Sequence, residues 1–273
     1  MNRLDQLIQY LLDEDPQYSE MRIPSDLQGK RDLFRALRNV RMPAPVSEEF
    51  LRLQDEELQA QLQEKGVVTV DDIIHYSRDW ARPASTTVHC NLSPITCILW
   101  QGDITRLRMD AIVNAANSQM LGCFHPLHKC IDNAIHSAAG VQLREECHLL
   151  MLRQGHPEET GTAKITKAYN LPCKHVIHTV GPIIPDGIPT EHQKEQLASC
   201  YRSIMACADE NSLESVAFCC ISTGEFRFPN EMAAEIAVKT VKDYLSTHPN
   251  TSLKYIVFNV FKDVDREIYQ RLL

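Results

Sequence analysis

Apolar residues at helical spacing dominate the first part of the chain. In LDQLIQYLL and RDLFRALRNV they recur every three or four positions, the period of a helix with one buried face. The stretch SEEFLRLQDEELQAQLQEKG begins at Ser47 and ends at Gly66, residue types that favour a helix start and a helix stop. The pattern therefore predicts a helical N-terminal extension over residues 1–80.

The pattern changes after a connecting segment, RPASTTVHCNLSP, which is rich in Pro, Ser and Thr. Short apolar runs then alternate with amphipathic helices. The expected strands are ITCILWQ, DAIVNAAN, TAKITKAYN, KHVIHTVGP, SVAFCCIST and KYIVFNVF. Strands that are apolar almost throughout indicate a sheet covered by helices on both faces. We therefore expect a three-layer α/β/α domain over residues 90–273.

Composition narrows the classes of function. With 44% hydrophobic residues the chain can bury a core. No secretory pattern opens it, and its apolar runs are shorter than a membrane span of ~20 residues, so we expect a cytoplasmic protein that binds no membrane. The 28 basic and 36 acidic residues give a net charge of −8, which disfavours nucleic acid. The ten cysteines are expected to be reduced thiols.

Polar residues gather where the expected strands end, the place where open α/β sheets bind their ligands. Asp103 follows the first strand in WQGDIT, and a turn in which it caps the next residues is an alternative to ligand binding. Asn114 and Asn117 end the second strand, and their amides suit sugar hydroxyls.

The loop CFHPLHKC offers four possible metal ligands within eight residues: Cys123, His125, His128 and Cys130. Thiolate and imidazole together favour zinc, and two thiolates with one imidazole leave a fourth position open. His128 lies close to Cys130, whereas His125 is either a bystander or a fourth ligand. Two buried cysteines beside surface histidines, or a disulfide, are the alternatives.

A third junction, CCISTGEFRFPNE, leads from a buried strand into Ser222-Thr223-Gly224, and a helix begins near Asn230. Successive backbone N–H groups in such a loop form a nest for an anion, and glycine permits close approach of a phosphate. The Walker A pattern is absent, so hydrolysis of nucleoside triphosphates is not expected.

Four motifs in this order resemble the macrodomain family: GDIT at 102–105, DAIVNAAN at 110–117, AIHSAAG at 134–140 and ISTGEFRFP at 221–229. The resemblance covers roughly residues 90–273. Where common macrodomains carry a glycine run, this chain has GCFHPLHKC. That variant is similar to the zinc-dependent macrodomains of microbes, which also carry a helical N-terminal extension.

The resemblance implies a mixed six-stranded sheet with ADP-ribose lying across the strand ends. Residues implied to bind it are Asp103 and Ile104 at adenine, Phe261 stacked on that ring, Asn117 at the distal ribose, and Ser222, Thr223, Gly224, Glu225 and Phe226 around the diphosphate. Cys123, His128 and Cys130 would hold Zn²⁺ beside the distal ribose, as a Lewis acid or to lower the pKa of a bound water. Asp132 is the candidate general base. Alternatively, its carboxylate is only a structural group, stabilised by its place at the N-terminus of a helix.

These features predict a zinc-dependent hydrolase that removes mono-ADP-ribose from modified proteins, with acidic side chains as the expected attachment sites. By family association, its partners would include a lipoylated carrier protein and a sirtuin-type ADP-ribosyltransferase. Two alternatives stand beside this: a reader that binds ADP-ribose around a structural zinc, and a hydrolase of small ADP-ribose esters. A fourth protein ligand on the metal would favour the reader.

Overall fold

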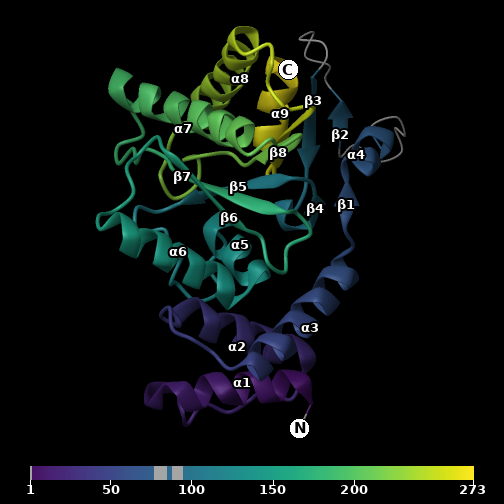
Figure 1. Ribbon diagram of the computed structural model, residues 1–273, viewed down its shortest axis with the longest axis vertical. Helices are drawn as coiled ribbons and strands as arrows, with labels where there is room; N and C mark the ends of the chain where they lie inside the picture. The colour runs from purple at the N-terminus through teal and green to yellow at the C-terminus, as the bar shows by residue number, and fades with distance from the viewer. Residues whose placement is uncertain (1, 77–84, 88–94) are drawn as a thin grey trace.

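The computed structural model describes residues 2–76, 85–87 and 95–273 (Figure 1). Its helices are α1 (Arg3–Glu14), α2 (Leu27–Val40), α3 (Glu48–Lys65), α4 (Val70–Tyr76), α5 (Ile131–Ala139), α6 (Val141–Gln154), α7 (Glu191–Glu210), α8 (Asn230–Thr247) and α9 (Asp263–Leu272). Its strands are β1 (Val68–Thr69), β2 (Ser85–Thr87), β3 (Thr96–Gln101), β4 (Leu107–Arg108), β5 (Ala111–Ala116), β6 (Ala163–Lys167), β7 (His175–Val180), β8 (Ser215–Phe218) and β9 (Tyr255–Val260).

The main sheet lies between two layers of helices, so the expected α/β/α architecture is confirmed (Figure 1). Its strand order is β2-β3-β9-β8-β5-β7-β6, in which the five central strands are parallel and the two edge strands antiparallel. All six expected strands are present in this mixed sheet. The difference is β2, a short seventh strand within the segment read as a connection; it pairs with β3 and covers an otherwise open edge. The rest of that segment lies outside the described residues.

The parallel pairing sends the carboxyl ends of β3, β9, β8, β5 and β7 to one edge of the sheet. Strand residues such as Ile112, Val113, Ile177 and Val257 are fully buried. They are apolar on both faces because helices cover both sides. The loops that follow these strands therefore meet at the carboxyl end of the sheet, above its buried core.

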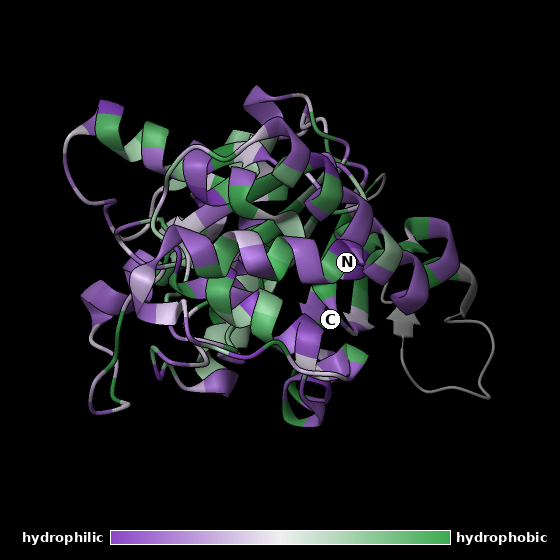
Figure 2. Ribbon diagram, turned by 90° about the horizontal axis from the view of Figure 1, so that it is seen from below, coloured by the Kyte–Doolittle hydropathy of each residue, from purple (hydrophilic) through white to green (hydrophobic). Residues whose placement is uncertain are grey.

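The helices α1, α2 and α3 form a separate group beside α5 and α6 (Figure 1). Viewed from the end that carries α1, hydrophobic and hydrophilic residues alternate along the helices, as in amphipathic helices (Figure 2). A second hydrophobic cluster, which includes Leu7, Phe34 and Phe50, holds the three together. The predicted ends of α3 are confirmed: the Ser47 hydroxyl accepts from the Phe50 N–H at 3.1 Å, and Gly66 ends the helix with a φ of 78°.

Buried polar side chains join this group to the rest of the protein. The guanidinium of Arg144 on α6 donates to the carbonyls of Arg38, Asn39 and Arg41 at 2.9, 2.9 and 2.6 Å, and so caps the end of α2. Burial lowers the pKa of Arg144 to about 10. Within the described parts of the chain, no helix has the length and apolar character needed to cross a membrane.

Asp110, just before β5, connects the starts of three strands. Its carboxylate lies 2.7 Å from the Lys174 ammonium and accepts from the Glu214 N–H at 2.8 Å and the Ser215 hydroxyl at 3.1 Å. Burial opposes the charged form, but these partners outweigh it and lower the pKa of Asp110 below its usual value. The ionised carboxylate therefore stabilises the folded sheet.

Asp110→Asn should lower the free energy of unfolding at pH 7 by about 1–2 kcal/mol, because hydrogen bonds to a charged acceptor are lost. The folded-state pKa lies below the unfolded one, so this contribution is complete above roughly pH 4 and disappears as the pH falls through the folded-state value. Urea unfolding from pH 7 to pH 3 should show wild type and variant converging in acid. A difference that stays constant with pH would contradict the ionic role.

Candidate active site

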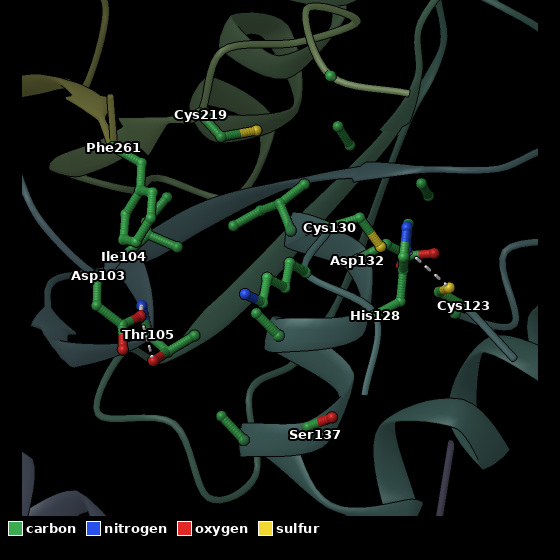
Figure 3. Close-up of a pocket in the computed structure, with 18 of the residues that line it drawn as sticks. Asp103, Ile104, Thr105, Cys123, His128, Cys130, Asp132, Ser137, Cys219 and Phe261 are labelled. Carbon is green, nitrogen blue, oxygen red and sulfur yellow. Dashed lines mark hydrogen bonds between the residues drawn. The ribbon is translucent and has the colours of Figure 1, made fainter. Parts of the chain in front are cut away.

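A cavity of about 910 Å³ lies at the edge where the parallel strands end. The thirteen residues that the macrodomain resemblance implies for binding, metal ligation and catalysis all line it: Asp103, Ile104, Asn117, Cys123, His128, Cys130, Asp132, Ser222, Thr223, Gly224, Glu225, Phe226 and Phe261. Figure 3 shows Asp103, Ile104 and Phe261 toward one side of the view and Cys123, His128 and Cys130 toward the other. The fold thus brings together residues that are up to 158 positions apart in the sequence (261 minus 103).

Asp103 caps the short 3₁₀ turn Ile104–Arg106, as the alternative reading proposed. One carboxylate oxygen accepts from the N–H and the hydroxyl of Thr105, at 3.0 and 2.6 Å. The other oxygen lies 3.5 Å from the Lys65 ammonium. Because the cap uses only one oxygen, the second can also accept a hydrogen bond from a ligand. Phe261, which directly follows β9, is 75% exposed and can be covered by a planar ring.

Cys123, His128 and Cys130 present three ligand atoms that all lie within 4.8 Å of one another. The Cys123 Sγ and His128 Nδ1 atoms are 3.5 Å apart. A tetrahedral zinc with bonds of ~2.3 Å to sulfur and ~2.0 Å to nitrogen would separate them by roughly 3.6 Å, so the donor set fits the metal. Both cysteines are free thiols. The exposed His125 stacks on the His128 ring at 5.3 Å and does not join the group.

The protonation state of Cys130 depends on whether a cation lies beside it. Burial, with a smaller contribution from the neighbouring Cys123, raises the pKa of the Cys130 thiol to about 12. A bound metal ion reverses this, since a coordinating thiol is deprotonated outright. The Cys130 sulfur also accepts from the Asn133 N–H at 3.4 Å, as the N-cap of α5. On His128, Nδ1 faces Cys123, and Nε2 lies 3.5 Å from the Glu225 carboxylate. Such a partner orients a metal-binding imidazole.

Asn114 lies beneath the cavity and not on its surface, which corrects the expectation that it binds a sugar hydroxyl. It is fully buried, and its Nδ2 donates to Asp132 Oδ1 at 2.8 Å and faces His178 Nδ1 at 3.1 Å. His178 Nδ1 therefore accepts, which leaves its Nε2 to donate to the Thr166 hydroxyl 2.9 Å away. The amide of Asn114 thus fixes both the orientation of Asp132 and the tautomer of His178.

Asp132 is the buried carboxylate of the site, 6% exposed in the first turn of α5. Burial raises its pKa to about 6, although the hydrogen bond from Asn114 acts in the opposite direction. Its Oδ2 atom lies 3.5 Å from the Asn117 amide, which also donates to the Gly122 carbonyl at 3.1 Å. Asn117 therefore shapes the loop as well as lining the cavity. A carboxyl with such a pKa can exchange a proton near neutral pH.

His136 fills the space under the loop. Its Nε2 lies 3.5 Å from Asp132 Oδ1, and burial lowers its pKa well below 6.5, so the ring is neutral. Gly122, with a φ of 78°, passes directly over it: a Cβ there would lie 2.8 Å from the ring. His136, Cys147 and His178 also form a compact buried group. Both ring nitrogens of His178 have side-chain partners, whereas neither ring nitrogen of His136 has a hydrogen-bond partner among the described residues.

The Ser222–Phe226 loop lines the cavity and contains donors that have no acceptor. Ser222 has a φ of 66°, and its buried hydroxyl has no hydrogen-bond partner among the described residues. Across those residues, the backbone N–H groups of Gly224, Glu225 and Phe226 likewise have no acceptor. Successive N–H groups without an acceptor suit a phosphate. Phe228 is buried in the core, whereas Phe226 lines the cavity.

The wall formed by α2 and α3 was not predicted. Arg31 and Arg35 line the cavity from α2, and Leu58, Leu62 and Lys65 line it from α3. In the sequence these residues are ordinary parts of two amphipathic helices, and no local signal distinguishes them. Only the packing of the N-terminal helices against α5 brings them to the site.

The chain was compared with known proteins. A family model described as "Macro domain" matches residues 113–237. A "Protein-ADP-ribose hydrolase" of Treponema medium is 49% identical over 273 residues, covering 98% of this chain and 96% of that relative. One of Staphylococcus aureus is 44% identical over 268 residues, covering 98% and 94%. The crystal structure of a Trypanosoma brucei macrodomain in complex with ADP-ribose has a TM-score of 0.64 at 28% identity, covering 86% and 94% of the two chains.

Gly122→Ala should destabilise the protein by about 1–3 kcal/mol more than Gly155→Ala, because its methyl group would strike the His136 ring. Gly155 is the matched control: its φ of 76° imposes the same backbone strain, and its Cβ position has no heavy atom within 4 Å. Chemical unfolding of both variants would measure the difference. Equal losses would show that the loop has room above His136.

Proposed function

The chain belongs to the macro domain family, and on that premise we propose that it is a zinc-dependent hydrolase that removes ADP-ribose from modified proteins. The observation that carries the proposal is the placement of the Cys123, His128 and Cys130 ligand atoms in the same cavity as Asp103 and Phe261. The relatives named protein-ADP-ribose hydrolase match nearly the full chain, N-terminal helices included. That coverage supports a shared activity.

In the proposed complex, ADP-ribose lies across the strand ends. Asp103 accepts from the adenine amino group, the Ile104 backbone contacts the same ring, and Phe261 stacks on it. The diphosphate lies against the unused donors of Ser222–Phe226. Asn117 holds the distal ribose, which places that sugar beside the metal ligands. Figure 3 supports the two ends of this order, with Asp103, Ile104 and Phe261 toward one side of the view and the metal ligands toward the other.

Three protein ligands with a fourth position open favour a catalytic metal over a structural one. His125 is exposed and lies outside the ligand group, which weighs against a closed site and against the reader alternative. A zinc ion held by the three residues would supply a Lewis acid beside the distal ribose. Glu225 would keep the His128 imidazole oriented through Nε2, while Ser222 and its loop hold the diphosphate still.

Asp132 is the proposed general base. Asn114 binds Oδ1 at 2.8 Å, whereas the contact of Oδ2 with the Asn117 amide is long, at 3.5 Å, so Oδ2 is the atom that takes the proton. Burial keeps its pKa at about 6, within the range in which a carboxylate can accept a proton and release it again. Because His136 is neutral, it adds no positive charge that would lower the pKa of Asp132.

The finer substrate assignment rests on the resemblance to zinc-dependent macrodomains. We propose mono-ADP-ribose on acidic side chains as the substrate, with a lipoylated carrier protein as one target of a sirtuin-type ADP-ribosyltransferase partner. A small ADP-ribose ester presents the same reacting group to the same ligands, so the two substrates differ only in what lies beyond the distal ribose. Comparing the rate of ADP-ribose release from a modified protein with the rate of hydrolysis of a small ADP-ribose ester would show which of the two is the better substrate.

Cys130→Ser should abolish zinc binding and lower the release of ADP-ribose from a modified protein by at least 100-fold. Serine retains an N-cap oxygen for α5, so the loss reports the missing thiolate and not an uncapped helix. Cys207→Ser on α7, which does not line the cavity, is the matched control and should keep full activity. A chelator should abolish ADP-ribose release by the wild type, and added zinc should restore that activity. Full turnover in chelator would refute the metal, and tight ADP-ribose binding without release would indicate a reader.

Asp132→Asn should lower kcat by a factor of about 10²–10⁴, the usual contribution of a general base. The asparagine carbonyl can still accept from Asn114, so zinc content and ADP-ribose affinity should stay near those of the wild type. Single-turnover release, with zinc content and ADP-ribose titration measured on the same samples, separates these effects. Unchanged turnover would remove Asp132 from the mechanism.

A further inference from the structure

We propose that α2 of the N-terminal extension is a functional part of the metal site, in which Arg35 and Asn39 position the ligand loop, residues 123–130, and thereby set its affinity for zinc. This inference rests on the proposed zinc-dependent function. It gives the N-terminal helices a role that neither the family match nor the fold assigns to them.

Arg35 reaches the ligand loop at two places. Its Nη2 donates to the His128 carbonyl at 3.1 Å and to Asn133 Oδ1 at 2.6 Å, and its Nε donates to the same Oδ1 at 3.2 Å. Asn133 in turn donates its side-chain amide to the His125 carbonyl at 3.0 Å and its N–H to the Cys130 sulfur at 3.4 Å. A single guanidinium therefore connects two of the three ligands to α2.

Asn39 holds the residue just before His128. It is 2% exposed, and its Oδ1 accepts from the Leu127 N–H at 3.0 Å, while its Nδ2 donates to the Ser137 hydroxyl at 3.0 Å. Leu127 has a φ of 56°, a conformation that costs a non-glycine residue on the order of 1 kcal/mol or more. The hydrogen bond that the Leu127 N–H donates to Asn39 favours this conformation, which presents His128 to the two cysteines.

The other end of the loop is tied to α2 through Arg144. Its guanidinium lies 4.3 Å from the centre of the Phe124 ring, next to Cys123, and the same group caps the carbonyls at the end of α2. A shift of α2 would therefore disturb the residues that flank both cysteines as well as His128.

These contacts bear on metal affinity because all the ligands lie on a loop and at its junction with α5. A loop must be held in place by its surroundings for its ligands to converge, and loss of such supporting contacts typically weakens metal binding 10- to 100-fold. The planar fork of arginine suits two acceptors from different residues, which the single ammonium of lysine does not match.

The test compares Arg35→Met with Arg31→Met in the full chain. Arg31 lies one turn earlier on the same helix, and among the described residues its side chain bonds only to Glu64, at 2.7 Å, and Glu57, at 3.4 Å, both on α3. The two variants lose the same charge and the same side-chain length. Only the first loses contact with the ligand loop. Zinc affinity is measured by competition with a chromophoric chelator, and the absorption spectrum of the Co²⁺-loaded protein reports the ligand geometry.

Arg35→Met should bind zinc 10- to 100-fold more weakly and show an altered Co²⁺ spectrum, while Arg31→Met should stay within about twofold of the wild type. Equal affinity of Arg35→Met and wild type would overturn the role of α2 while leaving the zinc site intact. A wild type that binds no zinc would overturn the proposed function itself. If Arg35→Met does not fold, Asn39→Ala provides the same comparison. Affinity lost equally in both arginine variants would also overturn the inference, because it would reflect general damage to the extension.

Discussion

The parallel ladder of five central strands is the constraint on which the rest of the structure depends. Parallel strands place their carboxyl ends at the same end of the sheet, and each connection must cross back over one of its faces, in most cases through α-helices. The turns after β3, β5, β7, β8 and β9 are therefore forced together, and they supply most of the cavity wall. The sheet beneath these turns is buried on both faces, which gives them a well-packed support.

The site depends on a second layer of polar contacts below that edge. Asn114 orients Asp132 from beneath, His136 supports Gly122, and the N-terminal helices hold the ligand loop from the side. None of these groups is required to touch a ligand. Each removes freedom from a group that would touch one, so the energetic cost of ordering the site is met during folding and not during binding.

Local patterns were enough to predict much of this. Ser47 and Gly66 mark the ends of a helix through their own backbone and side-chain chemistry, and the six main strands are apolar enough to be recognised individually. The proposed metal ligands could be named because all three fall within eight residues. What could not be predicted depends on distant pairs. Arg35 and Asn133 are 98 positions apart, and nothing near either residue indicates the other. The strand β2 was missed because three residues of edge strand carry too little pattern, and Asn114 was misplaced because strand periodicity does not reveal which tip residue turns inward.

The helical wall has a consequence for chemical probes of this protein. Leu58, Leu62 and Lys65 lie on successive turns of α3 and line the cavity, and the ammonium of Lys65 lies 3.5 Å from Asp103. An inhibitor that occupies the Asp103 side and extends over this surface would gain apolar contacts with the two leucines. The Lys65 ammonium, also outside the α/β sandwich, would pair with an anionic group on it. A macrodomain without these helices would offer neither, so selectivity could be designed into a region of the molecule that the common ligand does not need.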